Sequence, residues 1–597
     1  MSTLRAAAAA VRLTDDNMEQ LRSKEAVFTR PHEGEFRATA LVIEGDQRIA
    51  LVSVDALLVP GHIVRAAVDR LAAAERLPAG NVLVCGTHTH HAPSTLDYLG
   101  CTSNKEYLRR IEEGIVLAVT KAVSALEDPQ AGPNATQVEL LLGFAQEATV
   151  GRNSRLLLRD GMIGWWGYTE EDAVRPTGPY DPDLHVLALR RSDGSLAGLA
   201  FNHSVHNIGA LAPEVFSPAF YGHAAQELER RCGAITAFLP GAFGSTHNIT
   251  YTGSGISPAE CAHRVTEAAH EALRDARPIL MGPVRVLRKR FNYRLREFDE
   301  AREESVVKVY SEKYFPHVAE GQQQVFRQQR LEMQAAPDQE RSTWLTAIRL
   351  GDVALVGVPG EMFARLGLDL RHRSPFRHTM IVGLANDELG YIPDRQAIED
   401  GGYQTWPGWH SPFATGTGEA MVDQALEMLQ ELYDETQPSA VEPFIRPLGS
   451  HEALPLHTFY NPLSHDARRL FRPHGWNVTY DVCTGLCGTT GKGERFDLVL
   501  DTGRQIVGWC FLHHLDLPTP TLGIGLADTY CGRGWGTRLM DEIIAHARSL
   551  NKEAIELTVV RDNDRARALY ERCGFVKTGD RKGSDGLDYL QMRLRLT

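Results

Sequence analysis

Hydrophobic and polar residues follow one another along the first part of the chain in runs that predict an α/β domain. Residues 36–43 and 49–54 are apolar or alternating, and the turn EGDQ between them predicts a pair of strands. Residues 59–74 and 106–126 have the spacing of amphipathic helices. A buried strand is expected at 81–84, directly before the sequence CGTHTHHAP.

The same patterns continue further along the chain. They predict strands at 138–143, 184–190, 196–202, 234–239 and 380–384, a hairpin at 346–358, and helices at 220–231, 257–276 and 420–434. The charged, Gln-rich segment 295–337 predicts an exposed helical excursion with a solvated face. The Ala-rich start lacks the Leu and Phe of a signal sequence, so we expect a helix or a mobile end there.

A linker divides the chain. Residues 437–443, QPSAVEP, interrupt the pattern between a finished helix and a new strand. We therefore expect a large α/β domain at 1–436 and a smaller α/β domain at 444–597, a division that a length of 597 residues also favours.

Composition narrows the class of protein. Hydrophobic residues make up 43% and charged residues 23% of the chain, as in ordinary soluble proteins. The net charge of −13 argues against nucleic acid as a partner, and no apolar run is long enough for a membrane span. Nine scattered cysteines predict reduced thiols and a cytoplasmic location.

The histidines of CGTHTHHAP are the first candidates for chemistry. His88 and His90 would share one face at the end of a strand, and imidazole is a common metal ligand. A polar loop with ordinary histidines is the alternative. Further candidates follow other apolar runs, and a zinc site needs about three of them: His203, His206, His247 and Glu361.

Two motifs in the last part of the chain carry a second chemistry. CGRGWG at 531–536 follows a predicted strand and opens a predicted helix, a geometry that offers backbone N–H groups to a pyrophosphate. NDRARALYERCGF at 563–575 follows the next predicted strand. In this order the two motifs resemble those of the GCN5-related N-acetyltransferase (GNAT) family, over roughly the last 150 residues.

This resemblance implies an acetyltransferase that uses acetyl-CoA. Its pyrophosphate would lie on the glycine turn, formed by Gly532, Arg533, Gly534, Trp535 and Gly536, and Asn563 would contact the cofactor arm. Tyr570 would protonate the leaving thiolate, and Asp528 is a candidate for the base that deprotonates the amine. Cys531 stands where the family usually has Arg or Gln.

Six short segments of the first 435 residues, in order, resemble the neutral/alkaline ceramidase family and its wider relatives. They are THTHHAP, GRNSR, NHSVH, FYGHAAQELE with FLPGAFGSTHN, VPGE, and VGLANDELGYIP. The resemblance implies a zinc-dependent amidase with His88, His206 and Glu361 as Zn²⁺ ligands. His90 would stabilise the oxyanion or move a proton, and Arg152 would hold a polar group of the substrate.

The chain departs from this family at identifiable positions. Arg395 aligns with a tyrosine ligand of the family, and Tyr403 is a candidate to replace it at the substrate site. Gly244-Ser245 replaces a Gly-Asp pair. The immunoglobulin-like domain of ceramidases is replaced by the acetyltransferase, which favours a small soluble amide over a membrane lipid as the substrate.

Three functions agree with these observations. The first is a bifunctional enzyme that hydrolyses an amide and acetylates an amine, possible steps of one biosynthetic pathway. The second uses the same metal site to form an amide or close a lactam. In the third, the first domain is a scaffold that binds substrate for the acetyltransferase. The sequence does not distinguish their substrates or the oligomeric state.

Overall fold

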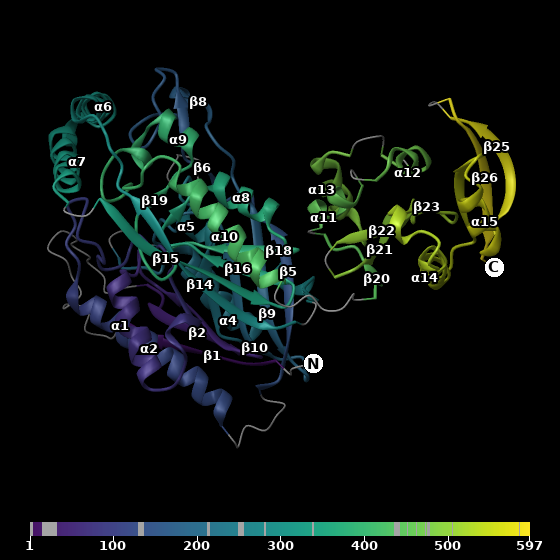
Figure 1. Cartoon of the computed structure of the whole chain (residues 1–597), viewed down its shortest axis with the longest axis horizontal. Coiled ribbons are helices and arrows are strands. Elements are labelled where there is room, and N and C mark those ends of the chain that lie inside the picture. Colours follow the sequence, from purple (N-terminus) through teal and green to yellow (C-terminus); the bar gives the residue numbers. More distant parts are fainter. Residues whose placement is uncertain are drawn as a thin grey trace. The chain divides into compact units, whose positions relative to one another are not determined.

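The computed structural model describes residues 4–14, 33–128, 136–211, 215–248, 256–279, 282–336, 339–434, 442–450, 452–460, 463–471, 473–474, 478–503, 505–583 and 586–596. The chain forms two compact units, 1–436 and 437–597 (Figure 1). Most of the linker expected at 437–443 lies outside the described residues. The mixed α/β class predicted from the sequence is confirmed.

The first unit begins with a four-stranded sheet in the order β1-β2-β3-β4. Its strands are β1 (Arg5–Arg12), β2 (Arg37–Glu44), β3 (Arg48–Val54) and β4 (Val82–Gly86). Helices α1 (Gly61–Ala73) and α2 (Lys105–Glu127) pack together beside it, with α2 against β1 and β2 (Figure 1). The strand β4 is parallel to β3, so the loop that carries the histidine motif leaves the carboxyl end of a buried strand.

The Ala-rich start forms the strand β1, so the expectation of a helix or mobile end is wrong. All eight residues pair antiparallel with β2, from Arg5 with Glu44 to Arg12 with Arg37. Ala6, Ala7 and Ala9 are buried between the layers on either side of the sheet. The small side chains allow this close packing, and tertiary pairing outweighs the helical preference of alanine.

A second sheet has the order β11-β10-β9-β5-β13. Its strands are β5 (Val138–Gln146), β9 (Asp183–Arg191), β10 (Leu196–His203), β11 (Thr236–Pro240) and β13 (Arg277–Pro278). Helices α4 (Ala219–Cys232) and α5 (Pro258–Arg274) pack on it and share an apolar core with β9, β10 and β11. The strands expected at 184–190 and 196–202 are present as β9 and β10, which pair antiparallel as a hairpin.

A third sheet has the order β14-β15-β16-β18. Its strands are β14 (Val284–Arg294), β15 (Glu340–Leu350), β16 (Val353–Gly357) and β18 (His378–Val382), and helices α8 (Ala364–Arg373) and α10 (Thr417–Asp434) pack against it. Shorter elements connect these layers: β6 (Gly151–Asn153), β7 (Leu156–Leu158), β8 (Ala173–Pro176), β12 (Thr246–Asn248), β17 (Glu361–Met362), β19 (Tyr391–Ile392) and α9 (Arg395–Asp400).

The predicted excursion consists of helices α6 (Glu300–Tyr314) and α7 (Ala319–Gln334). Much of their surface is exposed and charged, as expected, but an apolar face is buried. Tyr310 and Phe326 pack against Trp406, with ring centroids 5.6 and 5.1 Å from it. The excursion therefore supports the loop that follows α9 as well as facing solvent.

The second unit is built on one seven-stranded sheet in the order β20-β21-β22-β23-β24-β26-β25. Its elements are β20 (Phe444–Pro447), α11 (Ala453–Tyr460), α12 (His465–Leu470), α13 (Tyr480–Thr489), β21 (Arg495–Asp501), β22 (Ile506–His513), β23 (Thr521–Leu526), α14 (Trp535–Ser549), β24 (Ala554–Val560), α15 (Asp564–Arg572), β25 (Val576–Lys582) and β26 (Asp588–Arg595). Among the described residues, the parallel strands β23 and β24 pair only between Thr521 and Glu556, and they separate beyond this point.

No helix in the described part of either unit is both long and apolar enough to span a membrane.

Candidate functional site

A turn after β4 brings His88 and His90 together. The strand ends at Gly86, and His88 has a left-handed φ of 60°, which is uncommon for a residue with a side chain. The two Nε2 atoms are 3.2 Å apart. The expectation that both histidines share a face of a strand was therefore wrong in its mechanism, because a turn rather than strand alternation places the rings side by side.

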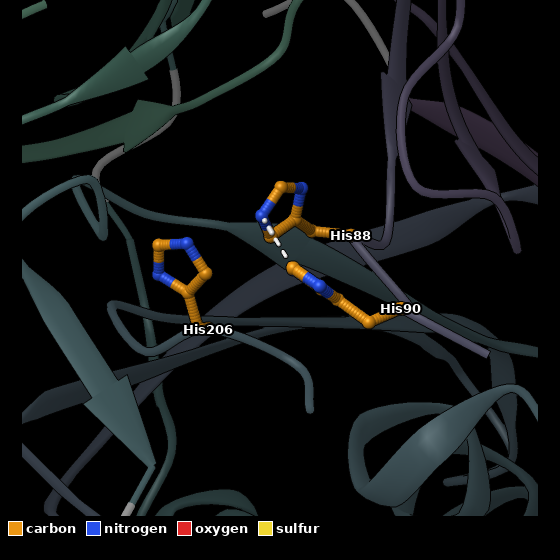
Figure 2. A group of neighbouring side chains, drawn as sticks. All are labelled: His88, His90 and His206. Carbon is orange, nitrogen blue, oxygen red and sulfur yellow. Dashed lines mark hydrogen bonds between the residues drawn. The ribbon is translucent and has the colours of Figure 1, made fainter. Parts of the chain in front are cut away.

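His206 and Glu361 reach the same place from other elements. His206 follows β10, and Glu361 opens β17. One carboxylate oxygen, Oε2 of Glu361, lies 3.2 Å from Nε2 of His206 and 3.6 Å from Nε2 of His88. The rings of His88, His90 and His206 converge in Figure 2, and one nitrogen from each lies within 4.8 Å of the others.

Backbone carbonyls fix the orientation of the two buried imidazoles. Nδ1 of His88 donates to the carbonyl of Leu57 at 2.9 Å, and Nδ1 of His206 donates to that of Thr246 at 2.7 Å. Each Nε2 therefore carries the lone pair that faces the cluster. Burial lowers the pKa of His88 well below its usual value and that of His206 to about 4, so both rings are neutral near pH 7.

Glu361 is the acidic residue of the cluster, and its carboxyl becomes negatively charged when a cation takes the place of its proton. Its Oε2 is buried and accepts no hydrogen bond from the described part of the chain. Burial raises the pKa of this carboxyl to about 8, because no protein cation compensates the charge. Two neutral imidazoles and one uncompensated carboxylate are a donor set that fits a divalent metal ion, and three protein ligands are typical of catalytic zinc sites.

Other histidines of the motifs lie elsewhere. His203 is bonded to the hydroxyl of Tyr221 at 2.7 Å and faces the carbonyl of Glu147, in a separate buried polar group. Nε2 of His91 accepts the N–H of Gly209 at 3.0 Å. The sequence resemblance names His206 as a ligand and does not include His203 or His91. In the structure, His206 lies beside Glu361, whereas His203 and His91 make hydrogen bonds elsewhere.

His247 lies beside the cluster although the sequence resemblance gave it no role. Its ring is 4.2 Å from that of His206, and its buried Nε2 has no hydrogen-bond partner in the described chain. His247 pairs in register with Arg152 between β12 and β6, so the two side chains leave the same face of this short ribbon. Arg152 is half-buried, with Nη1 3.4 Å from Glu170 on a neighbouring turn. The signal for His247 was its position after an apolar strand.

Tyr403, and not Arg395, lies near the carboxyl of Glu361. Arg395 is exposed on α9. Tyr403 stacks on Trp165 at 4.0 Å and on His410 at 5.2 Å. Burial and the nearby carboxylate of Glu361 raise the pKa of Tyr403, so its hydroxyl is protonated and close to the candidate ligand.

Arg155, from the GRNSR motif, is a residue that sequence reasoning missed. It is fully buried, and its guanidinium donates to the carbonyls of Ala397 and Gly401 and to the side chain of Gln404. These contacts hold both sides of the loop that carries Tyr403. Burial lowers the pKa of Arg155 to about 10, and the charges of Asp394 and Asp400 partly offset this effect, so the guanidinium stays charged.

Replacing Arg155 by alanine is expected to lower the free energy of unfolding of the first unit by about 3 kcal/mol, because buried carbonyls lose their donors and a cavity is left. Urea unfolding followed by tryptophan fluorescence measures this. Arg159, an exposed arginine with a bond to the carbonyl of Glu171, is the matched control, and Arg159→Ala should cost less than about 0.5 kcal/mol. Equal costs for both variants would contradict the anchoring role.

The pH dependence of stability is expected to depend on His203. Burial lowers its folded-state pKa to about 4, below the unfolded value of about 6.5. Between these values the unfolded chain binds the proton and the folded chain does not, so His203 reduces stability as the pH falls. The destabilisation caused by His203→Gln at pH 7 should therefore shrink by about 2 kcal/mol at pH 5. An unchanged cost for His203→Gln between pH 7 and pH 5 would refute the assignment.

The glycine turn of the second unit has the geometry expected of an anion site. Gly532 and Gly534 have left-handed φ values of 74° and 86°, and Gly534 is the N-cap of α14. Arg533 lies between them, and all three residues are exposed, so their N–H groups and the helix N-terminus face solvent. Trp535 is the first residue of the helix and is buried, which fixes the turn to the core. Gly536 follows within the helix and packs near Leu569.

The second motif starts at the N-terminus of α15. The side chain of Asn563 caps this helix by accepting the N–H of Ala566 at 3.1 Å. Tyr570 is buried in the core of the unit, and burial raises the pKa of its hydroxyl, so the phenol is protonated at working pH. Asp528 is exposed in a short 3-10 helix after β23. The separation of β23 from β24 leaves a gap in the sheet beside these residues.

Comparison of the sequence with known families and proteins finds similarity to N-acetyltransferases. Residues 460–575 match the model of the Acetyltransferase (GNAT) family. The chain is 32% identical over 79 residues to the uncharacterized N-acetyltransferase YycN of Bacillus subtilis, covering 13% of this chain and 51% of that protein. It is 38% identical over 64 residues, 11% of this chain, to the 5-NmdU N-acetyltransferase of Pseudomonas phage PaMx11. The chain spans about half the length of these curated relatives, 51% and 44%.

Comparison with solved structures identifies the fold of the first unit. Neutral ceramidase from Pseudomonas aeruginosa matches with a TM-score of 0.55 and 18% identity, covering 74% of this chain and 76% of that protein. A structure described as ceramidase complexed with C2 matches with a TM-score of 0.55 and 19% identity over 74% of this chain and 77% of that one. At this identity the likeness shows a shared fold.

Proposed function

We propose that this chain, which joins a unit with the fold of neutral ceramidase to an acetyltransferase domain of the GNAT family, is a bifunctional enzyme. The first unit hydrolyses an amide bond in a small soluble substrate with the help of Zn²⁺. The second unit transfers an acetyl group from acetyl-CoA to an amine. The observation that carries the first half is the convergence of His88, His206 and Glu361 at one buried point.

In the first unit, His88, His206 and Glu361 would hold the metal. When bound, zinc supplies a Lewis acid that polarises the amide carbonyl and makes water more acidic. His90, with its Nε2 beside His88, is placed to accept a proton and return it to the leaving amine. Arg152 and the protonated hydroxyl of Tyr403 would bind polar groups of the substrate on either side.

In the second unit, the exposed N–H groups of Gly532, Arg533 and Gly534 would bind the pyrophosphate of acetyl-CoA, helped by the dipole of α14. The gap between β23 and β24 would admit the rest of the cofactor arm beside Asn563. Asp528, the candidate base, would take a proton from the amine. The amine nitrogen attacks the thioester carbonyl, the C–N bond forms and the C–S bond breaks, and the protonated Tyr570 donates its proton to the departing sulfur.

The two reactions share a chemical group, because the first releases a free amine and the second acylates one. One chain that performs both would exchange the acyl group of a substrate and raise the local concentration of the intermediate. We also place the enzyme in the cytoplasm, since all nine of its cysteines are free thiols.

The test combines metal analysis with product identification. Protein purified without chelator is expected to contain about one zinc per chain and to release CoA from acetyl-CoA when an amine is supplied. A panel of N-acyl amines, analysed by mass spectrometry, should give products that have gained one water. A product that joins an amine to an acyl group with loss of water would instead support amide formation. Turnover by the second unit alone would support a scaffold role for the first unit.

A further inference from the structure

We infer that the amine acetylated by the second unit carries an anionic group, a phosphate or a carboxylate, which arginines bind in a cavity beside the separated strands. The inference rests on the proposed acetyl transfer and adds the charge class of its acceptor. It is independent of the metal centre of the first unit.

The cavity lies where the acceptor must reach the thioester. It has a volume of about 510 Å³. Gly523 of β23 and Thr558 of β24 both line it, just beyond the last pair formed by these strands. Gly523 precedes the end of β23 at Leu526 by three residues, or roughly 10 Å of extended chain, and the glycine turn follows. An acceptor in the cavity would therefore meet a cofactor arm that runs from the turn into the gap.

The charged residues that line the cavity are all basic. Arg469, Arg495 and Arg581 contribute guanidinium groups, and His474 and His513 add imidazoles. Neither aspartate nor glutamate is among the described lining residues. A second amine would have no carboxylate to pair with here, whereas a phosphate or carboxylate would find several donors.

The three arginines differ in how far protein carboxylates compensate them. Arg469 has an exposed ion pair with Asp562 at 3.1 Å, which a ligand can replace at small cost. Arg581 is exposed on β25 and has no ion pair within the described residues. It is therefore the residue whose charge is most available to an acceptor.

Arg495 is held in a fixed orientation. Its Nε and Nη2 donate to the buried carboxylate of Asp497, which also accepts the indole N–H of Trp509 at 2.8 Å. The guanidinium lies 4.5 Å from the ring centroid of Phe511. These contacts leave Nη1 as the nitrogen available to a ligand, so Arg495 is preorganised to bind an oxyanion.

The properties of His474 support a cavity whose charge comes from the arginines. Burial lowers the pKa of His474, and the charge of Arg495 lowers it further. The buried Nε2 of His474 has no hydrogen-bond partner in the described chain. A neutral imidazole beside fixed guanidinium groups leaves a site that repels a second cation in the acceptor and attracts an anion.

A matched series of two-carbon amines tests the inference in the full chain. Ethanolamine, O-phosphoethanolamine, β-alanine and ethylenediamine each carry a primary amine on a spacer of two methylene groups, and they differ in the group at the other end, which is a hydroxyl, a phosphate, a carboxylate or a second amine. We expect kcat/KM for the phosphate or the carboxylate compound to exceed that for ethanolamine at least about tenfold, with ethylenediamine the poorest acceptor. The better of the two anionic compounds identifies the oxyanion.

The outcomes separate this inference from the function on which it rests. If acetyl-CoA binds, measured by calorimetry, but the four amines react equally, none reacts, or ethylenediamine is preferred, the anionic acceptor is refuted. If acetyl-CoA does not bind, the acetyltransferase function itself fails.

Arg581→Gln should lower the ratio of kcat/KM for the anionic compound to that for ethanolamine about tenfold, mainly through KM. Arg548→Gln, an exposed arginine of α14, should leave this ratio unchanged, and the same ratio in both variants would contradict the role of Arg581.

Discussion

Replacing His206 by alanine is expected to reduce the zinc content of the protein from about one ion per chain to less than a tenth. Amide hydrolysis should fall at least about 10³-fold, which corresponds to ~4 kcal/mol. The reason is geometric: Nε2 of His206, in the loop after β10, lies 3.2 Å from Oε2 of Glu361, so its loss removes one of the proposed ligands. Glu361→Gln should have a comparable effect, because it keeps the volume of the side chain and removes the negative charge. Elemental analysis after dialysis and an assay of amine release measure both quantities.

His91→Asn is the matched control for these variants. His91 belongs to the same motif as His88 and His90 but is bonded to the N–H of Gly209 rather than to the cluster. Its substitution should leave zinc content and hydrolysis within about twofold of the original. Urea unfolding of the first unit, followed by tryptophan fluorescence, checks the folding of every variant. Retention of full zinc in both His206→Ala and Glu361→Gln would refute the metal centre.

The second large effect is expected at Gly534. Its φ of 86° is unfavourable for a β-branched residue, and the place of an added Cβ is free of protein atoms within 4 Å. That open space lies over the N-terminus of α14, where the pyrophosphate of acetyl-CoA would bind. Gly534→Val should therefore raise the dissociation constant of acetyl-CoA at least about 100-fold, or ~2.7 kcal/mol. Calorimetric titration with CoA and the rate of CoA release measure this.

Gly493 offers a control with the same backbone demand. Its φ is 91°, a Cβ there also meets no atom within 4 Å, and it lies in the turn before β21, outside the glycine turn of α14. Gly493→Val should incur a similar strain in folding and leave the affinity for acetyl-CoA almost unchanged. If both valine variants lose affinity equally, strain rather than the anion site explains the loss.

Much of the candidate metal centre could be predicted because its residues follow apolar strands. A buried strand is visible as a hydrophobic run, and the polar side chain that follows it lies at an edge of a sheet where others converge. This logic made His88, His203, His206, His247 and Glu361 candidates, and the family resemblance selected His88, His206 and Glu361 from them. It failed for His90, whose position depends on a left-handed φ at His88 that a sequence of polar residues does not reveal.

Other features depend on partners that are distant in sequence. A run of alanines predicts a helix in isolation, and only the pairing of β1 with β2 and the packing of α2 make it a strand. Arg155 appeared to be one of two arginines in a turn, yet its contacts lie about 240 positions later, at separations of 242 to 249 residues. The residues that line the basic cavity come from several strands and from α12, so no contiguous sequence motif predicts the cavity.

In the proposed zinc centre, the metal would compete with a proton for the carboxyl of Glu361. With a pKa of about 8, this group holds a proton at neutral pH until a cation replaces it. Uptake of the ion is therefore coupled to the release of a proton, and affinity for zinc grows with pH until the carboxyl is ionised. A modest acidification would favour the metal-free chain, so the supply of zinc and the acidity of the surroundings act together on the fraction of molecules that carry the metal.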